Sequence, residues 1–348
     1  MDSRLSADRR KNMKPNLSRI ALSGIKPTGI PHLGNYLGMI RPALNLARNY
    51  RAFYFIADAH ALNQIHDAGE LDRLIFEVAA TLLAIGLDPE TVTFFRQSDI
   101  AEIFELATIL AASTPKGLLN RAHAYKAAVD DNLAAGRDAD AGINMGLFTY
   151  PILMAADILL FGSHAVPVGE DQRQHVEIAQ DIAQAFNRAY GDVLTVPEAV
   201  IGANIADIPG TDGRKMSKSH GNVIPIFAPP AELRKIVMGI VTDSRPPEQP
   251  KDPEQDTLFR LYRFFAGEAE VESMREKYLR GGFGYGEAKQ ALFDALERTF
   301  GEARGRYERI INDRPYLEGV LRYGAVKARA AGAPMLEKVR RAVGIRSS

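Results

Sequence analysis

Near the amino terminus, residues 19–35 read RIALSGIKPTGIPHLGN. The first six of these residues predict a buried strand, and a turn rich in glycine and proline leads from it into a helix expected over residues 32–49. In an open parallel sheet such a turn lies at the carboxyl end of its strand, which is the edge where ligands bind. The stretch therefore indicates an α/β fold with a ligand site close to the beginning of the chain.

Strands and helices continue to alternate after this first unit. Further strands are expected at residues 52–58, 92–96 and 164–168, with helices at 71–85 and 172–190. This alternation predicts a doubly wound, Rossmann-like parallel sheet. Residues of about 101–150 have helical patterns and interrupt the alternation, so they are expected to form a helical insertion.

The last third of the chain has helical periodicity and no strand pattern. The helices expected there cover residues 232–241, 258–266, 287–300, 301–312 and 316–331. We therefore expect a disordered polar tail over residues 1–18, an α/β domain over 19–224 and an all-helical domain over 225–348.

Composition excludes several classes of function. The 348 residues include no cysteine, which rules out disulfides, a thiolate nucleophile, iron–sulfur clusters and cysteine-based zinc sites. Residues 1–18 lack the apolar segment of a secretory signal, and no apolar run is long enough to cross a bilayer. We expect a cytoplasmic protein without a membrane partner.

Charge is balanced along the whole chain but not at its end. Lys+Arg and Asp+Glu both number 43, whereas residues 304–348 contain 11 basic and 4 acidic side chains. A basic carboxyl-terminal surface suits a polyanion such as RNA, and a solvated helical face explains it equally well.

The turn after the first strand has the composition of a phosphate site. Its glycines allow a nucleotide to approach the backbone, and the helix that follows offers unpaired N–H groups and a partial positive charge. His32 and Asn35 would both project from the first helical turn toward that phosphate. A structural turn in which His32 caps the helix at the surface is the alternative.

A second basic loop reads GRKMSKS at residues 213–219. Two lysines and two hydroxyl groups on a loop that begins with glycine can neutralise the charge of a departing pyrophosphate. Taken alone, the same letters describe any basic loop.

The segment YPILMAADIL at residues 150–159 predicts a helix with Pro151 at its first position. Tyr150, Met154 and Asp157 then fall on one helix face. Asp157 stands among apolar residues, and a buried carboxylate needs hydrogen-bond donors. A ligand N–H group could supply the donor, and so could a backbone group or an arginine.

Residues 169–175, GEDQRQH, follow another strand at the same predicted edge of the sheet. They can border a ligand, or they can form an ordinary acidic helix start. His175 is expected to be structural, and Lys126 in the insertion is a further candidate contact for phosphate or RNA.

Together, HLGN at residues 32–35 and KMSKS at residues 215–219 resemble the two signatures of class I aminoacyl-tRNA synthetases. The resemblance extends over residues 19–348 and is close to the bacterial tryptophanyl branch. It departs from the usual first signature at Asn35, and Lys26 stands where that branch often has glutamine.

For ATP, the resemblance implies a set of contacts. Gly34 would lie against adenine, His32 and Asn35 would contact phosphates, and Lys26 would lie on the ATP side. Gly169, Glu170 and Asp171 would border the ribose. The residues implied for the ATP phosphates and the leaving pyrophosphate are Lys215, Met216, Ser217, Lys218 and Ser219.

For the amino acid, the resemblance implies that Asp157 accepts the indole N–H group and that Met154 flanks the ring. Tyr150 would complete the pocket, and Gln172 would face the α-amino or carboxylate group. Tyrosyl enzymes look like Tyr-x-x-x-Gln-x-x-Asp at this place, and thioether sulfur cannot replace the hydrogen bonds of that glutamine.

The implied reaction is ATP-dependent activation of tryptophan and its transfer to tRNA(Trp), with Mg²⁺ accompanying ATP and no protein-bound metal. A homodimer joined near the insertion is also implied. A tyrosyl-tRNA synthetase, a small-molecule nucleotidyltransferase and an inactive RNA-binding relative are the alternatives.

Overall fold

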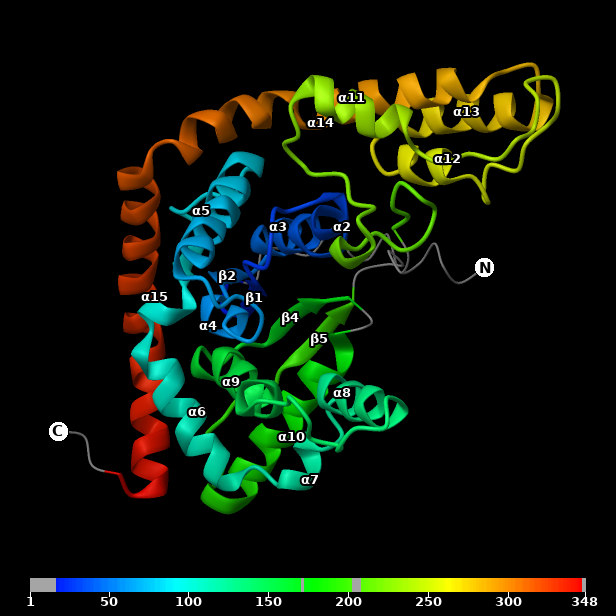
Figure 1. Ribbon diagram of the computed structural model, residues 1–348. Helices are drawn as coiled ribbons and strands as arrows, with labels where there is room; N and C mark the ends of the chain where they lie inside the picture. Colours follow the sequence, from blue (N-terminus) through cyan, green and yellow to red (C-terminus); the bar gives the residue numbers. More distant parts are fainter. Residues whose placement is uncertain (1–16, 170–171, 202–207, 346–348) are drawn as a thin grey trace, which may run out of the picture.

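The computed structural model describes residues 17–169, 172–201 and 208–345, and Figure 1 shows their arrangement. Parallel strands form a central sheet in the order β3-β2-β1-β4-β5. The strands are β1 (Ile20–Ile25), β2 (Arg51–Ile56), β3 (Thr93–Arg96), β4 (Ala165–Val168) and β5 (Glu198–Ile201). The chain starts in the middle with β1, moves outward to β3 and returns to the other side of β1 with β4. In doubly wound sheets ligands bind at this reversal.

Helices cover both faces of the sheet because the side chains of each strand alternate between them. In β2, Tyr54 and Ile56 belong to one buried apolar cluster, and Phe53 and Phe55 belong to the other. The first cluster includes α2 (Leu33–Asn35), the π-helical turn η1 (Tyr36–Ile40), α3 (Arg41–Ala47) and α5 (Ala68–Ile85). The second includes α6 (Ala101–Ser113), α9 (Met145–Leu160) and α10 (Arg173–Tyr190). The predicted fold class is confirmed.

The predicted insertion is helical. It contains α6, the short α7 (Lys116–Leu119), α8 (His123–Ala134) and the beginning of α9. Three further short segments lie elsewhere in the chain: α4 (Asp58–Ala61), the 3₁₀ turn η2 (Gln97–Asp99) and the 3₁₀ turn η4 (Lys218–His220).

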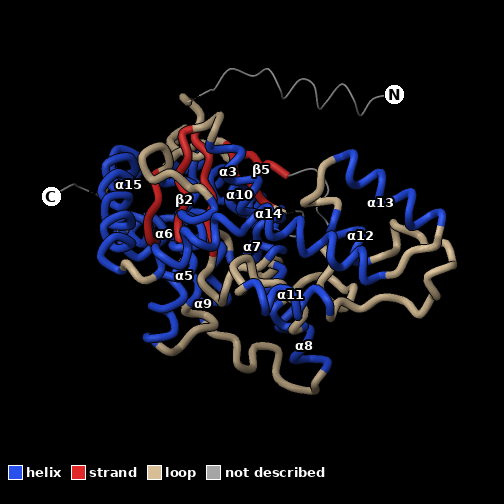
Figure 2. Tube along the Cα trace, turned by 90° about the horizontal axis from the view of Figure 1, so that it is seen from above, coloured by secondary structure: helices blue, strands red, loops and turns tan. Residues whose placement is uncertain are grey.

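The carboxyl-terminal helices are α11 (Pro230–Met238), α12 (Thr257–Tyr262), α13 (Glu268–Arg280), α14 (Tyr285–Ile311) and α15 (Arg314–Val343). Of these helices, α15 packs against the sheet. Figure 2 shows α12 and α13 at one end of the molecule and α15 at the other, beside the sheet. A Cβ atom added to Gly324 of α15 would lie 1.6 Å from the carbonyl oxygen of Phe94 in β3, so the two backbones are in direct contact. Both apolar clusters contain residues of α15. The division of the chain near residue 224 stays a prediction.

Several expected element boundaries are wrong. The predicted helix break at Gly301 does not occur, because Leu296, Phe300 and Ala303 continue one buried stripe along α14. Helix α15 runs beyond residue 331 and includes Pro334. Neither β5 nor α13 was expected.

The prediction that Pro151 opens a helix is also wrong. Helix α9 begins at Met145, where the Asn144 side chain accepts a hydrogen bond from the Leu147 N–H group at 2.8 Å. Pro151 therefore lies inside the helix, and Tyr150 is a helical residue.

Candidate active site

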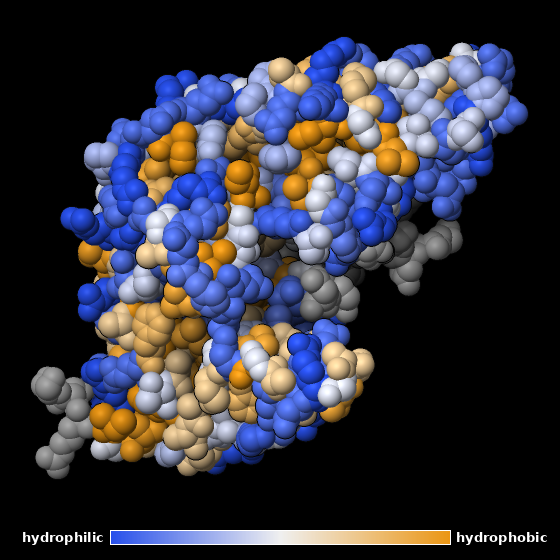
Figure 3. Space-filling view, viewed as in Figure 1, coloured by the Kyte–Doolittle hydropathy of each residue, from blue (hydrophilic) through white to orange (hydrophobic). Residues whose placement is uncertain are grey.

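A cavity of about 890 Å³ opens at the carboxyl ends of β1 and β4. Its walls come from the turn after β1, from α9, from the turn after β4 and from the 215–218 loop. Figure 3 shows an indentation on the right side of the molecule, between α11–α13 above and α8 below. A cavity of this size at this place in a doubly wound sheet suits a nucleotide and a second small ligand.

The first signature is fixed by its own backbone and by a distant segment. Asn35 Oδ1 accepts a hydrogen bond from the His32 N–H group at 3.1 Å. The Leu33 N–H group donates to the carbonyl of Ile224 at 2.9 Å, and the Ile226 N–H group donates to that of Pro31 at 3.2 Å. These bonds attach the turn after β1 to the chain that follows residues 213–219, which we call the lysine loop.

The two signatures are in direct contact. The Gly34 N–H group points to the sulfur of Met216 at 3.2 Å. Lys218 lies along Gly29, where an added Cβ atom would be 2.9 Å from the Lys218 ammonium. Gly29 also has a φ of +142°, which favours glycine. Because Gly29 and Gly34 have no side chains, the lysine loop can lie directly against the turn after β1.

Positive charge gathers at this end of the cavity. Lys26, Lys215 and Lys218 all line it. Partial desolvation lowers the pKa of Lys26 and the pKa of Lys218. Burial and the nearby Lys218 lower the pKa of His32 to about 4, so that its imidazole is neutral at physiological pH. His32 Nδ1 is buried without a hydrogen-bond partner. These groups can neutralise and hydrogen-bond a polyphosphate.

The hydroxyl groups of the lysine loop point elsewhere. Ser217 Oγ and Ser219 Oγ hydrogen-bond each other at 2.8 Å, and neither serine is among the residues that line the cavity. Asn222 Oδ1 accepts from the Ser217 N–H group at 2.8 Å. In this arrangement the two serines shape the loop, and its lysines and Met216 face the cavity.

Asp157 also lines the cavity, and it is 1% exposed. His60 Nε2 lies 3.0 Å from Asp157 Oδ2, and Gln97 Nε2 donates to both carboxylate oxygens at 2.8 and 2.9 Å. Burial raises the pKa of Asp157, and these hydrogen bonds oppose the rise. His60 and Gln97 thus take the place of the backbone group or arginine considered as donors, and a ligand donor stays a prediction. A carboxylate has about four acceptor positions, so Asp157 can still accept from a ligand.

Tyr150, Met154 and Asp157 line the cavity from one face of α9. The cavity is also lined by apolar side chains from the sheet, from the residue after β2 and from α9: Leu22, Phe55, Ala57, Ile158 and Val166. An apolar slot that ends in one buried acceptor suits a flat ring that carries an N–H group.

Of the other predicted site residues, Lys26, Gly34, Asn35, Gly169 and Gln172 also line the cavity. Glu170 and Asp171 lie outside the described residues. Lys126 is exposed on α8 and does not line it.

Arg340, in the basic carboxyl-terminal segment, is paired with acidic side chains of the protein. Its guanidinium donates to both carboxylate oxygens of Glu105 at 2.6 Å and to Glu337 at 2.6 Å. Arg340 therefore joins α15 to α6, because a bidentate pair of this kind holds two helices in register.

Sequence reasoning missed His60, Gln97 and Phe55. His60 follows β2 by four residues, so its place at the carboxyl edge of the sheet was a usable signal. Gln97 directly follows β3, so its place at the same edge of the sheet was an equally usable signal, although its contact with Asp157 joins residues 60 positions apart.

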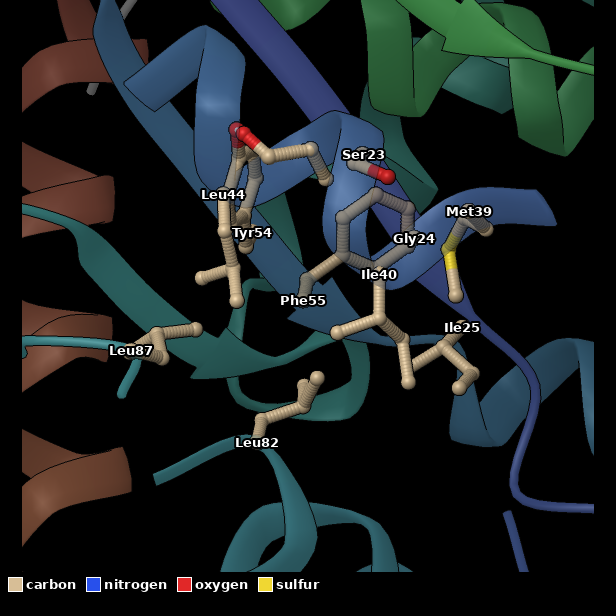
Figure 4. Close-up of a pocket in the computed structure, with 11 residues that line it drawn as sticks. Ser23, Gly24, Ile25, Met39, Ile40, Leu44, Tyr54, Phe55, Leu82 and Leu87 are labelled. Carbon is tan, nitrogen blue, oxygen red and sulfur yellow. The ribbon is translucent and has the colours of Figure 1, made fainter. Parts of the chain in front are cut away.

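A much smaller cavity of about 20 Å³ lies behind the site (Figure 4). Its lining is almost entirely apolar and includes Met39, Ile40, Leu44, Leu82 and Leu87. It shares Gly24 and Phe55 with the large cavity, and Figure 4 shows the Phe55 ring beside Gly24. The volume is about that of one water molecule, so this space is a packing defect and not a second ligand site.

Among the described residues, no three His, Asp or Glu side chains are grouped so that they could hold a metal ion. None of the helices in the described part of the chain is both long and apolar enough to cross a membrane.

The fold and the cavity together define a class I aminoacyl-tRNA synthetase. The family model described as tRNA synthetases class I (W and Y) matches residues 14–301, and the chain belongs to this family of ATP-dependent ligases. Within it, the chain is 53% identical to the tryptophan–tRNA ligase of Pseudomonas aeruginosa over 94% of this chain and 74% of that protein. It is 52% identical to the Bordetella pertussis protein of the same name, over 93% of this chain and 72% of that protein.

Solved structures agree with this placement. Tryptophanyl-tRNA synthetase from Campylobacter jejuni, complexed with ADP and tryptophan, matches with a TM-score of 0.84 and 41% identity. The match covers 93% of this chain and 99% of the other. Tyrosyl-tRNA synthetase from Archaeoglobus fulgidus, at 19% identity and a TM-score of 0.63, shares the fold alone. The comparisons therefore favour the tryptophan branch over the tyrosine branch.

Proposed function

We propose that this protein is a tryptophan–tRNA ligase. It activates L-tryptophan with ATP and then esterifies the 3′-terminal ribose of tRNA(Trp). The observation that carries the proposal is one cavity whose lining includes three lysines, a set of apolar side chains and the buried carboxylate of Asp157. The close relatives named tryptophan–tRNA ligase support the same conclusion.

In the first step, a tryptophan carboxylate oxygen attacks the α-phosphorus of ATP. The bond between that phosphorus and the oxygen bridging to the β-phosphate breaks, and pyrophosphate leaves. Lys215 and Lys218 meet the charge that develops on the leaving group, and neutral His32 and Asn35 hydrogen-bond the phosphates. Lys26 adds a third cation on the ATP side. Gly34 gives adenine close access to the backbone.

Mg²⁺ enters as part of the substrate MgATP, because phosphate oxygens are the ligands that this ion prefers. Gly169, with Glu170 and Asp171, borders the ribose. Met216, Ser217 and Ser219 shape the loop that carries the two lysines, and Met216 also lies against the adenine side next to Gly34.

In the amino-acid slot, Asp157 accepts the indole N–H group while His60 and Gln97 hold its carboxylate in place. Met154 flanks the ring with an apolar, polarisable surface. The thioether of Met154 offers a phenol no hydrogen bond comparable to that of an amide, which disfavours tyrosine. Tyr150 and Gln172 face the α-amino group.

In the second step, the terminal ribose hydroxyl of tRNA attacks the tryptophanyl carbonyl carbon, and AMP leaves. We propose that residues 19–224 form the catalytic domain and that the helical region 225–348 binds tRNA(Trp). A homodimer through the 101–150 insertion is proposed on the same family resemblance, and so is action in the cytoplasm, where tRNA is charged.

The test is amino-acid-dependent exchange of labelled pyrophosphate into ATP. We expect exchange with tryptophan and Mg²⁺, and none with the other nineteen amino acids at equal concentration. Exchange with tyrosine and not tryptophan would refute the specificity, and no exchange at all would refute the activity.

A further inference from the structure

One histidine of the cavity wall is bonded on both sides to residues proposed to hold the amino acid. His175 Nε2 lies 2.7 Å from the Tyr150 hydroxyl oxygen. His175 Nδ1 lies 2.6 Å from Gln172 Oε1. All three side chains line the large cavity. Tyr150 comes from α9, whereas Gln172 precedes α10 and His175 lies in its first turn. The imidazole therefore bridges two separate elements where they border the site.

The direction of the hydrogen atoms follows from the bonding partners. Gln172 Oε1 can only accept, so Nδ1 of His175 must donate to it. A neutral imidazole has one N–H group, and Nε2 is then the acceptor. The Tyr150 hydroxyl must donate to Nε2. Burial raises the pKa of Tyr150, so its hydroxyl keeps the proton needed for this bond.

His175 is in the first turn of α10, an 18-residue helix, so its ring is held at a fixed place beside Tyr150. With its proton directed at His175, the Tyr150 hydroxyl can present only lone pairs to the cavity. An oxygen that only accepts is matched to a cation and mismatched to a carboxylate.

We propose that His175 is a positioning residue that turns Tyr150 into an obligate acceptor for the α-ammonium group of the amino-acid substrate. The inference rests on the proposed function, and it deepens that function by assigning the choice between ammonium and carboxylate to one hydrogen-bond chain. Gln172 fixes the tautomer of His175, and His175 fixes the hydroxyl of Tyr150. Gln172 thus acts on the substrate partly through the histidine.

The test compares tryptophan with indole-3-propionate, which has the same ring and carboxylate but no ammonium group. Binding of each is measured by calorimetry with wild-type protein and with His175→Phe, which keeps a ring of similar size but breaks the chain. We expect tryptophan to bind about tenfold or more weakly, in line with the loss of a hydrogen bond to a charged group. Binding of indole-3-propionate should change less than about twofold. In pyrophosphate exchange, KM for tryptophan should rise while kcat stays within about threefold.

Further variants sharpen the result. His175→Gln can still accept from Tyr150 and donate to Gln172, so it should recover most of the tryptophan affinity. In a double-mutant cycle, the variant with both Tyr150→Phe and His175→Phe should bind tryptophan little more weakly than either single variant, because each substitution breaks the same hydrogen-bond chain. Gln174→Ala is the matched control: Gln174 is the neighbouring first-turn residue, bonds Arg121 and His123 of the insertion, and does not line the cavity.

Equal weakening of tryptophan and indole-3-propionate by His175→Phe would overturn the inference and make His175 a structural residue. Unchanged tryptophan binding would overturn it as well. If wild-type protein exchanges pyrophosphate with a different amino acid, the proposed specificity is wrong, and the same comparison is made with that amino acid and its deaminated analogue. The two failures are therefore distinguishable.

Discussion

Replacing Asp157 by alanine should have two separable effects, one on stability and one on the choice of substrate. The side chain accepts hydrogen bonds from His60 and Gln97 at the closed end of the cavity. In the proposed complex it also accepts from the indole N–H group. Asp157→Ala removes the acceptor from all three donors at once.

The stability loss can be sized from the two protein donors. Each buried donor left without a partner costs about 1–3 kcal/mol, so the pair costs about 2–6 kcal/mol. At roughly 2 °C per kcal/mol for a chain of this length, Tm should fall by about 4–12 °C. The indole N–H group adds about 1–3 kcal/mol to the loss for tryptophan alone, which is a decrease in kcat/KM of about 5- to 150-fold.

The assay is pyrophosphate exchange at a temperature well below the lowered Tm, with tryptophan and with its benzothiophene analogue, which has sulfur in place of the N–H group. The analogue never made this bond, so the variant should use it as well as the wild-type protein does. Gln97→Ala is the control, because it removes a donor to Asp157 and leaves the acceptor in place. It should lower Tm and keep the preference for tryptophan over the analogue.

The chain has no tryptophan, so the fluorescence of bound tryptophan can be read without a background from protein tryptophan. A folded Asp157→Ala protein that still prefers tryptophan to the analogue by the wild-type factor would refute the role of Asp157 in recognition. Equal losses for both substrates would show that the side chain is purely structural.

Three other predictions follow from the contacts of single residues. Lys218→Ala should lower kcat of adenylate formation by about 10²–10³ with little change in tryptophan affinity, because its charge acts on the leaving pyrophosphate; a change confined to KM for ATP would contradict this role. The pKa of His32 is about 4 in the folded protein and near 6.5 in the unfolded chain, so the free energy of unfolding should be highest above pH 6.5 and fall by up to about 3 kcal/mol as the pH drops toward 4. The difference between the unfolding free energies measured with urea at pH 7 and pH 4.5 should be smaller for His32→Asn than for the wild-type protein, and an equal difference would exclude His32 as the cause. Gly324→Ala places a Cβ atom 1.6 Å from the Phe94 carbonyl oxygen and should cost more than about 3 kcal/mol, whereas Gly319→Ala on the same helix meets nothing within 4 Å and should be neutral or stabilising in thermal unfolding.

Local patterns could predict much of the sheet. The strands β1 to β4 and the helices α5 and α10 are long enough, or apolar enough, for periodicity to find them. Strand β5 has the residues EAVI, which contain too little alternation to stand out, and it forms because β4 offers it a parallel partner. Helix α14 continues through Gly301 because burial of its apolar stripe outweighs the weak helix propensity of one glycine.

The sequence by itself determined the class of the site. The site motifs contain glycines, His32 and two lysines. Their chemistry depends on backbone turns and on residue types, and both of these follow from short stretches of sequence. The order of the strands did not follow from local alternation, because the chain between β3 and β4 passes through the 101–150 insertion before it returns to the other side of β1.

Only the tertiary structure decided which partners each functional side chain has. Asp157 forms hydrogen bonds with His60 and Gln97. Tyr150 forms one with His175, and Arg340 forms one with Glu105. Tyr150 and His175 are 25 positions apart, and the other contacts join residues 60 to 235 positions apart. Such pairs depend on how helices from different parts of the chain pack on the sheet. Hydrogen bonds are directional and short, so a residue's type shows what it can bond, and only its position in the folded chain shows what it does bond.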